Sequence, residues 1–229
     1  LFYGHFRSQQ DQRWLDPKLE VDQKKVCWII ALKGFDKQLT EPFFKSLITQ
    51  SYADYRIIFT FESDQDEGYI WLRNHLGLTE KEAVWYPSIS SGLESVSLVV
   101  AGPARDCGQK VHNQIAAFAR LRQDDKIIAF ADADITCPPE TLSRLVVPIN
   151  MGHFDVMTTF RWLIPGDSHP ATLLGSVINA SCATMGGHVF LNTVWGGMVA
   201  IERETFEELR VPDRFSRVLS DDLTLNSLV

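Results

Sequence analysis

A short apolar run that ends in two carboxylates is the feature that most constrains how this chain can fold. Residues 127–131 read Ile-Ile-Ala-Phe-Ala, with a lysine before the run and two prolines soon after it. An uninterrupted apolar run of this length is typical of a strand covered on both faces of a parallel sheet. Asp132 and Asp134 follow directly. We therefore expect them at the carboxyl edge of the sheet, where ligands bind in open α/β folds.

The spacing of these two aspartates allows two interpretations. If the strand continues through them, Asp132 and Asp134 share one face, because side chains alternate along a strand. Two like charges held so close repel unless a cation compensates them. A Mg²⁺ or Mn²⁺ ion that also carries phosphate oxygens is the natural partner. The alternative is a solvated turn in which Asp134 caps the next helix, and this stretch alone does not separate the two.

Similar apolar runs alternate with helical patterns along the rest of the chain. Further strands are predicted at 26–32, 55–61, 96–100, 154–160 and 195–201. Strands that alternate with helices predict an α/β fold with a doubly wound, mostly parallel sheet. The 229 residues suffice for one such domain. We assign 1–25 to a lead-in arm and 26–229 to a single catalytic domain that is incomplete at its C-terminus.

Composition and charge limit the classes of binding partner that the sequence predicts. The net charge is −7 and no run of lysine or arginine occurs, so we expect no nucleic acid. The four cysteines form no C-x-x-C pair, and Cys27 lies inside an apolar run, which favours a buried free thiol. No apolar run reaches the ~18 residues that span a bilayer. We expect a soluble domain as the sequence stands, with any membrane association coming from segments outside it.

Two later stretches carry further candidates. Residues 173–190 are rich in Gly, Ala, Ser and Met; helix packing in general favours a core helix there, and a surface for an apolar substrate is the alternative. The glycines at 196 and 197 would let another group approach the backbone of their strand. Asp221 and Asp222 open the final helix after Ser220. Taken alone, that segment is a helix N-cap with acids in the first turn.

Six segments follow one another in a recognisable order: Ile30-Ala31-Leu32-Lys33-Gly34, Arg56-Ile57-Ile58-Phe59 with the acids after it, Gly108…Lys110…Asn113, Asp132-Ala133-Asp134, Trp195-Gly196-Gly197-Met198 and Ser220-Asp221-Asp222-Leu223. In this order they resemble inverting GT-A glycosyltransferases, from about Val26 to Leu225. Within that family the chain is most similar to the ceramide glucosyltransferase branch and its bacterial relatives.

The resemblance implies a GT-A nucleotide-diphospho-sugar transferase fold and a role for each motif. Asp222 would be the catalytic base, and Asp134 and Asp132 would hold Mg²⁺ or Mn²⁺. The acceptor side would include Trp195, Gly196, Gly197 and Asp221. Donor-binding residues would be Ala31, Lys33, Glu62, Asp64, Lys110, Asp132 and Asp134. The acidic cluster leaves open which of Glu62, Asp64 and Asp66 contacts the nucleotide.

The implied activity is metal-dependent transfer of a sugar, with inversion, from a UDP-sugar to an acceptor hydroxyl. The similarity to ceramide glucosyltransferases implies a lipid or lipid-linked acceptor, and work at the cytoplasmic face of a membrane. One departure stands out. The Q/R-x-x-R-W motif of the family has no match after Asp222, and Arg161-Trp162 lies before it. The chain ends at Val229, which accounts for the missing motif and leaves open whether it and apolar spans follow.

Two other functions fit parts of the sequence. An apolar strand followed by D-x-D-x-T is also the signature of haloacid-dehalogenase phosphatases. Asp132 would then be the nucleophile, Asp134 the general acid and base, and Asp221-Asp222 the metal ligands. That fold usually places its nucleophile near the start of the domain, whereas here most of the α/β pattern precedes Asp132. The remaining alternative is a non-catalytic module that only binds a nucleotide.

Overall fold

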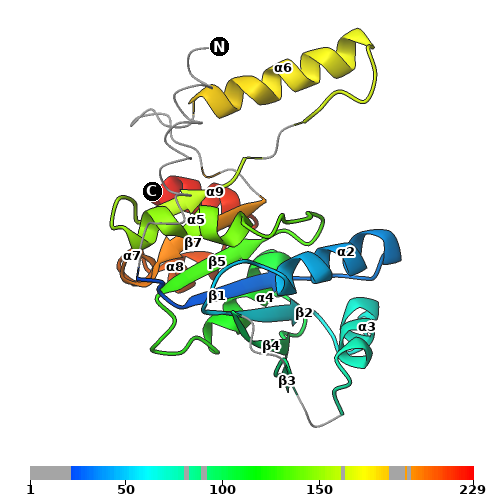
Figure 1. Cartoon of the computed structure of the whole chain (residues 1–229), viewed down its shortest axis with the longest axis vertical. Helices are drawn as coiled ribbons and strands as arrows, with labels where there is room; N and C mark the ends of the chain where they lie inside the picture. Colours follow the sequence, from blue (N-terminus) through cyan, green and yellow to red (C-terminus); the bar gives the residue numbers. More distant parts are fainter. Residues whose placement is uncertain (1–21, 80–82, 89–91, 161–162, 186–193, 195–196) are drawn as a thin grey trace.

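A mostly parallel sheet forms the centre of the molecule (Figure 1). The computed structural model describes residues 22–79, 83–88, 92–160, 163–185, 194 and 197–229. Most of the predicted lead-in arm therefore lies outside the described residues. In the described part, seven strands are ordered β3-β4-β2-β1-β5-β7-β6.

Four of the predicted strands pair in parallel, whereas those predicted at 154–160 and 195–201 pair antiparallel. The four parallel strands are β1 (Val26–Ala31), β2 (Tyr55–Phe61), β4 (Leu93–Val100) and β5 (Ile127–Ala131). Antiparallel pairing adds β3 (Val84–Trp85) beside β4, β7 (Met198–Glu202) beside β5, and β6 (Val156–Thr158) beside β7. The α/β fold class is confirmed.

Helices cover both faces of this sheet, as side-chain alternation along β1 demands. Trp28 packs in one apolar cluster and Ile29 in the other. The first cluster includes side chains of α2 (Lys37–Ile48), α3 (Glu67–His75) and α5 (Thr141–Asn150). The second includes side chains of α4 (Gln109–Phe118), α7 (Arg203–Glu208), α8 (Val211–Phe215) and α9 (Asp221–Leu228). Both faces of the central strands are thereby buried, which explains why β1 and β5 are apolar throughout. β2 also contains Arg56 and Thr60, which are buried and hydrogen-bonded.

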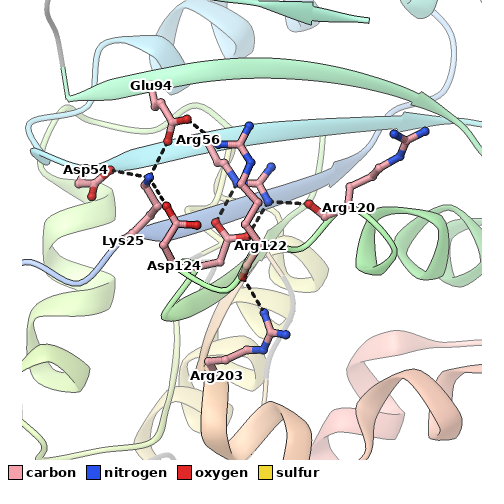
Figure 2. A network of polar contacts seen from close by, with 9 residues as sticks. Lys25, Asp54, Arg56, Glu94, Arg120, Arg122, Asp124 and Arg203 are labelled. Carbon is pink, nitrogen blue, oxygen red and sulfur yellow. Dashed lines mark hydrogen bonds and ion pairs between the residues drawn. The ribbon is translucent and has the colours of Figure 1, made fainter.

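A network of ion pairs closes the amino-terminal edge of the sheet (Figure 2). At its centre the Arg56 guanidinium donates to both carboxylate oxygens of Asp125, and both side chains are buried. Around this pair, Lys25 contacts Glu94 and Asp124 at 2.7 Å each. These residues lie at or before the starts of β1, β2, β4 and β5. The network therefore links the starts of these strands. It lies at the edge opposite the carboxyl edge, where ligands are expected.

The helix α6 (Pro170–Met185) corrects one expectation. In Figure 1 it stands apart from the layers around the sheet. Its apolar side chains are exposed rather than packed in a core: Leu173, Leu174, Val177 and Ile178 are each 44–65% accessible. The core-helix interpretation is wrong for the described residues, because the apolar stripe faces outward.

Two smaller expectations concern the thiols and the membrane. Cys27 is a buried free thiol, as predicted. It is the second residue of β1 and packs in the second apolar cluster, which explains that burial. Within the described ranges, no helix is both long and apolar enough to cross a bilayer.

Candidate active site

The two aspartates after β5 lie in a turn at the carboxyl edge of the sheet. β5 ends at Ala131, so the strand does not continue through Asp132 and Asp134. The backbone N–H of Asp132 donates to the Gly197 carbonyl at 2.9 Å, which fixes this turn beside the start of β7. Asp132 is half-buried and Asp134 is exposed. The turn interpretation is correct, but its capping part is wrong, because Glu140 occupies the N-cap position of α5.

Lys110 joins this turn to the second acidic pair. Its Nζ lies 2.8 Å from Asp132 Oδ1 and 2.8 Å from Asp221 Oδ2. Burial acts to lower the pKa of Lys110, but the charge of Asp221 and the hydrogen bonds to Asp132 and Asp221 raise it above its usual value. The lysine therefore stays protonated and balances two carboxylates that would otherwise repel.

The acidic pair sits in the first turn of α9. Ser220 is the N-cap, and its hydroxyl accepts from the Leu223 N–H at 3.3 Å. The N-cap interpretation is therefore correct, and the same turn carries the candidate base. Asp221 is buried, while Asp222 is half-buried. Burial first, and the neighbouring charge of Asp221 second, raise the pKa of Asp222 above that of an ordinary aspartate. A carboxylate with raised proton affinity suits a general base.

The oxygen ligands at this edge fit a hard divalent cation. Among the described residues no three His, Cys, Asp or Glu side chains gather closely enough to hold a metal by themselves. Mg²⁺ is usually bound by one or two carboxylates together with substrate phosphates, so it needs no larger protein cage. Asp132 and Asp134 supply two carboxylates of that kind. A cation there would neutralise the charge of a leaving diphosphate.

The predicted donor residues before α4 lie at the carboxyl ends of the neighbouring strands β1 and β2. Ala31 ends β1, and Lys33 follows it with an exposed side chain whose Nζ lies 3.7 Å from Glu62 Oε2. Glu62 is half-buried and Asp64 is exposed.

Asp66, in contrast to Glu62 and Asp64, has a structural role. Its carboxylate caps α3 by accepting from the Gly68 N–H at 2.8 Å, and it also accepts from the Gly34 N–H at 3.0 Å. Gly68 in turn lies against the Gly34 carbonyl, where a Cβ would come within 2.5 Å. These bonds lock the loop after β1 to the start of α3, so Glu62 and Asp64 are the better candidates for nucleotide contact.

On the predicted acceptor side, Trp195 and Gly196 lie outside the described residues. Gly197 has a φ of 115°, a conformation that only glycine adopts readily. That conformation accompanies its carbonyl contact with Asp132. A recess connects these groups; it is lined by Lys110, Phe130, Ala131, Asp132, Gly197, Met198, Val199, Asp221 and Asp222. The structure thus brings Asp132, Lys110, Gly197 and the acidic pair together.

Two residues without a predicted role support the segment of the acidic pair; Gly108 appeared only in the resemblance, and Gln114 was missed. Gln114 Nε2 donates to Asp221 Oδ2 at 2.7 Å. Gly108 donates from its N–H to the Val218 carbonyl, and a Cβ there would lie 2.4 Å from the Leu219 carbonyl oxygen. The available signal was helical spacing, because Lys110 and Gln114 are four residues apart and so share one face of α4.

Comparison with known proteins agrees with this arrangement. The chain belongs to glycosyl transferase family 21, whose family profile matches residues 1–229. A comparison with curated proteins gave no significant match.

Two solved structures resemble the chain. The N-terminal part of TarS from S. aureus (residues 1–349) is 14% identical with a TM-score of 0.54; the match covers 89% of this chain and 54% of that one. Glucosyl-3-phosphoglycerate synthase from Mycobacterium tuberculosis, solved with Mn²⁺, UDP and glucosyl-3-phosphoglycerate, is 14% identical with a TM-score of 0.47, covering 86% and 68%. The chain thus spans about half the length of the TarS structure. At this identity the TarS likeness supports the GT-A type of α/β fold and nothing finer.

Proposed function

We propose that the protein transfers a sugar, with inversion, from a nucleoside diphosphate donor such as a UDP-sugar to a hydroxyl of a lipid acceptor. One observation carries this proposal. Lys110 joins Asp132, in the turn that would face the diphosphate, to Asp221, which precedes the candidate base Asp222. Family membership supports glycosyl transfer in general. The same membership favours this activity over the phosphatase interpretation of Asp132.

In this reaction Asp222 acts as the proton acceptor. The acceptor hydroxyl gives its proton to the Asp222 carboxylate while its oxygen bonds to the anomeric carbon of the sugar. The bond from that carbon to the diphosphate oxygen breaks, and the diphosphate leaves with the electron pair. Attack from the face opposite the leaving group inverts the anomeric carbon, as in inverting glycosidases. The raised pKa of Asp222 supports its role as the base.

Asp132 and Asp134 are the proposed ligands of Mg²⁺ or Mn²⁺, which would offset the charge of the leaving diphosphate. Lys110 adds a protein cation beside Asp132 and limits the repulsion among the carboxylates. Glu62 or Asp64, beyond β2, would contact the nucleoside. Lys33 and Ala31, at the end of β1, would border the same part of the donor.

The outward apolar stripe of α6 supports a lipid acceptor presented at a membrane. The segment Pro170–Met185 has no Asp, Glu, Lys or Arg. Its polar side is engaged within the chain: Ser176 donates to the Leu163 carbonyl, and Asn179 accepts from the Leu163 N–H. Its opposite side exposes four apolar side chains, those of Leu173, Leu174, Val177 and Ile178. Ile164 nearby is 81% accessible. Burying such a stripe in an apolar phase is favourable by ~0.8 kcal/mol per methylene.

The deciding experiment incubates the full-length protein with a labelled UDP-sugar, a divalent cation and either a membrane lipid extract or soluble sugars. Label in the organic phase supports the whole proposal. Label only in soluble glycans rejects the lipid acceptor but keeps the transferase. Retained binding of UDP-sugar without label in either fraction points to the non-catalytic module. Release of inorganic phosphate from phosphomonoesters, without transfer, would instead favour the phosphatase.

A further inference from the structure

The contact between Gln114 and Asp221 joins two helices that are far apart in sequence. Gln114 lies in α4 and Asp221 opens α9, 107 residues later. The Gln114 side chain is only 1% exposed and Asp221 only 6%. Their hydrogen bond of 2.7 Å is therefore shielded from water.

Asp221 receives two donors from one helix face. Lys110 and Gln114 are one helical turn apart on α4, and both donate to the same oxygen, Asp221 Oδ2, at 2.8 and 2.7 Å. A carboxylate held by two donors from a rigid helix loses its rotational freedom. The first turn of α9 is thereby fixed relative to α4.

The backbone next to this turn is fixed in the same way. Gly108, the N-cap residue of α4, donates to the Val218 carbonyl at 2.8 Å and lies against the Leu219 carbonyl. The segment before α9 therefore packs directly on the start of α4. Asp222 follows Asp221 in the chain, so its position depends on this junction.

Burying the Gln114 amide is unfavourable unless its N–H group forms a useful hydrogen bond. Within the described part of the chain, Gln114 Oε1 is buried and finds no hydrogen-bond partner. A buried polar atom without a partner costs free energy, and an apolar side chain such as Met would avoid that cost. The Nε2 donor of Gln114 explains why an amide side chain stands here, because it hydrogen-bonds the buried Asp221 carboxylate.

We propose that Gln114 is a positioning residue for the reaction: by fixing Asp221 it places the Asp222 carboxylate for proton transfer. The inference rests on the proposed function, in which Asp222 is the base. Gln114 hydrogen-bonds Asp221, on the side of the proposed base, so we expect it to act on turnover and not on donor affinity. Lys110, in contrast, touches both acidic groups.

The first test compares Gln114→Met with Tyr52→Phe in the full-length protein. Methionine matches the size of glutamine but lacks the donor. Tyr52 is equally buried, and its hydroxyl bonds the Lys24 carbonyl at the amino edge of the sheet, so its loss controls for a weakened core. We expect Gln114→Met to lower kcat about tenfold with KM for the UDP-sugar within about twofold. Tyr52→Phe should leave both constants unchanged. A kcat for Gln114→Met within about twofold of wild type overturns the proposal.

The second test is independent of activity. Amide hydrogen exchange over residues 219–225 should be faster in Gln114→Met than in wild type, while exchange over α5 should stay the same. Unchanged exchange at 219–225 overturns the anchoring, whatever the activity. A wild-type protein that transfers no sugar would reject the proposed function instead, and the exchange rates would still decide whether Gln114 holds the junction.

A third variant separates positioning from packing. In Gln114→Glu the introduced carboxyl faces Asp221, among the charges of Lys110 on α4, Asp222 on α9 and Asp132 after β5. When protonated it can donate to Asp221 as the amide does, and when ionised it repels. The ratio of its kcat to that of wild type should rise as the pH falls, whereas the ratio for Gln114→Met should stay flat. Equal pH dependence of the two ratios contradicts the assignment.

Discussion

Asp132 and Asp221 share one cation: Lys110 Nζ lies 2.8 Å from a carboxylate oxygen of each. The first aspartate follows a central strand and the second opens a helix near the end of the chain. The lysine thus couples the proposed donor side to the proposed base side.

The first prediction concerns the metal. Because Asp134 supplies one of two carboxylates to the proposed cation, Asp134→Ala should abolish most of the Mg²⁺- or Mn²⁺-dependent part of UDP-sugar affinity. Titration calorimetry with and without a chelator measures this. Glu208→Ala, which removes an exposed carboxylate from α7, is the matched control and should bind as wild type does. Equal affinity of the wild-type protein in both buffers would reject the metal role.

The second prediction concerns the base. Asp222→Asn keeps the shape of the side chain but removes its proton acceptor, so kcat should fall by about 10²–10⁴. Binding of the nucleotide should change little, as equilibrium binding to UDP will report. Asp221→Asn should lower kcat less than Asp222→Asn does, because Asp221 positions Asp222 and places a negative charge beside it. A parallel loss of UDP affinity in Asp222→Asn would place this residue in the donor site.

The third prediction concerns pH. Burial and the charge of Asp221 raise the pKa of Asp222, so activity should fall on acidification at a pH above the ordinary value of ~3.9. Asp221→Asn removes one cause and should move this acid limb to lower pH in a profile of kcat against pH. An acid limb that does not shift would exclude a charge effect of Asp221.

The same raised pKa has a consequence for stability. A carboxyl that binds its proton more tightly in the folded state destabilises that state when ionised. Its unfavourable contribution is present above the raised pKa and disappears as the pH falls through it. Asp222→Asn should therefore raise Tm at pH 7, with a smaller gain at pH 4, in calorimetric scans. A lower Tm for this variant at pH 7 would contradict the unfavourable charge.

The fourth prediction concerns the amino edge of the sheet. Arg56→Leu leaves Asp125 as a buried charge without its guanidinium, which should lower the free energy of unfolding by about 3–5 kcal/mol. Arg122→Leu removes a half-exposed partner of Glu94 and should cost about 0–1 kcal/mol. Urea denaturation measures both. Similar losses for the two variants would show that burial of the Arg56 pair does not matter.

The fifth prediction concerns α6. Changing Leu174 and Val177 together to Gln should reduce co-sedimentation with lipid vesicles and transfer to lipid acceptors. Because both side chains are exposed, Tm should stay the same. Leu39→Gln, at an equally exposed apolar position on α2, is the control and should keep vesicle binding. Unchanged sedimentation of the α6 variant would remove the membrane role from this helix.

The sequence by itself determined the layers of the fold. Continuous apolar runs marked β1 and β5, because a strand covered on both faces is built mainly from apolar side chains. The same reasoning placed Asp132 and Asp134 at the carboxyl edge, since they follow a buried strand directly. The raised proton affinity of Asp222 was also predictable from its charged neighbour, although burial turned out to be the first cause.

Only the tertiary structure decided which residues act together. The orientation of α6 could not be read from its composition, because an apolar stripe looks the same whether it faces a core or the outside. The N-cap at Ser220 and the site at Asp222 occupy one turn, and local sequence shows only the cap. Contacts such as Gln114 with Asp221 join segments that meet only when the chain has folded, because hydrogen bonds depend on distance in space and leave no local pattern in the sequence.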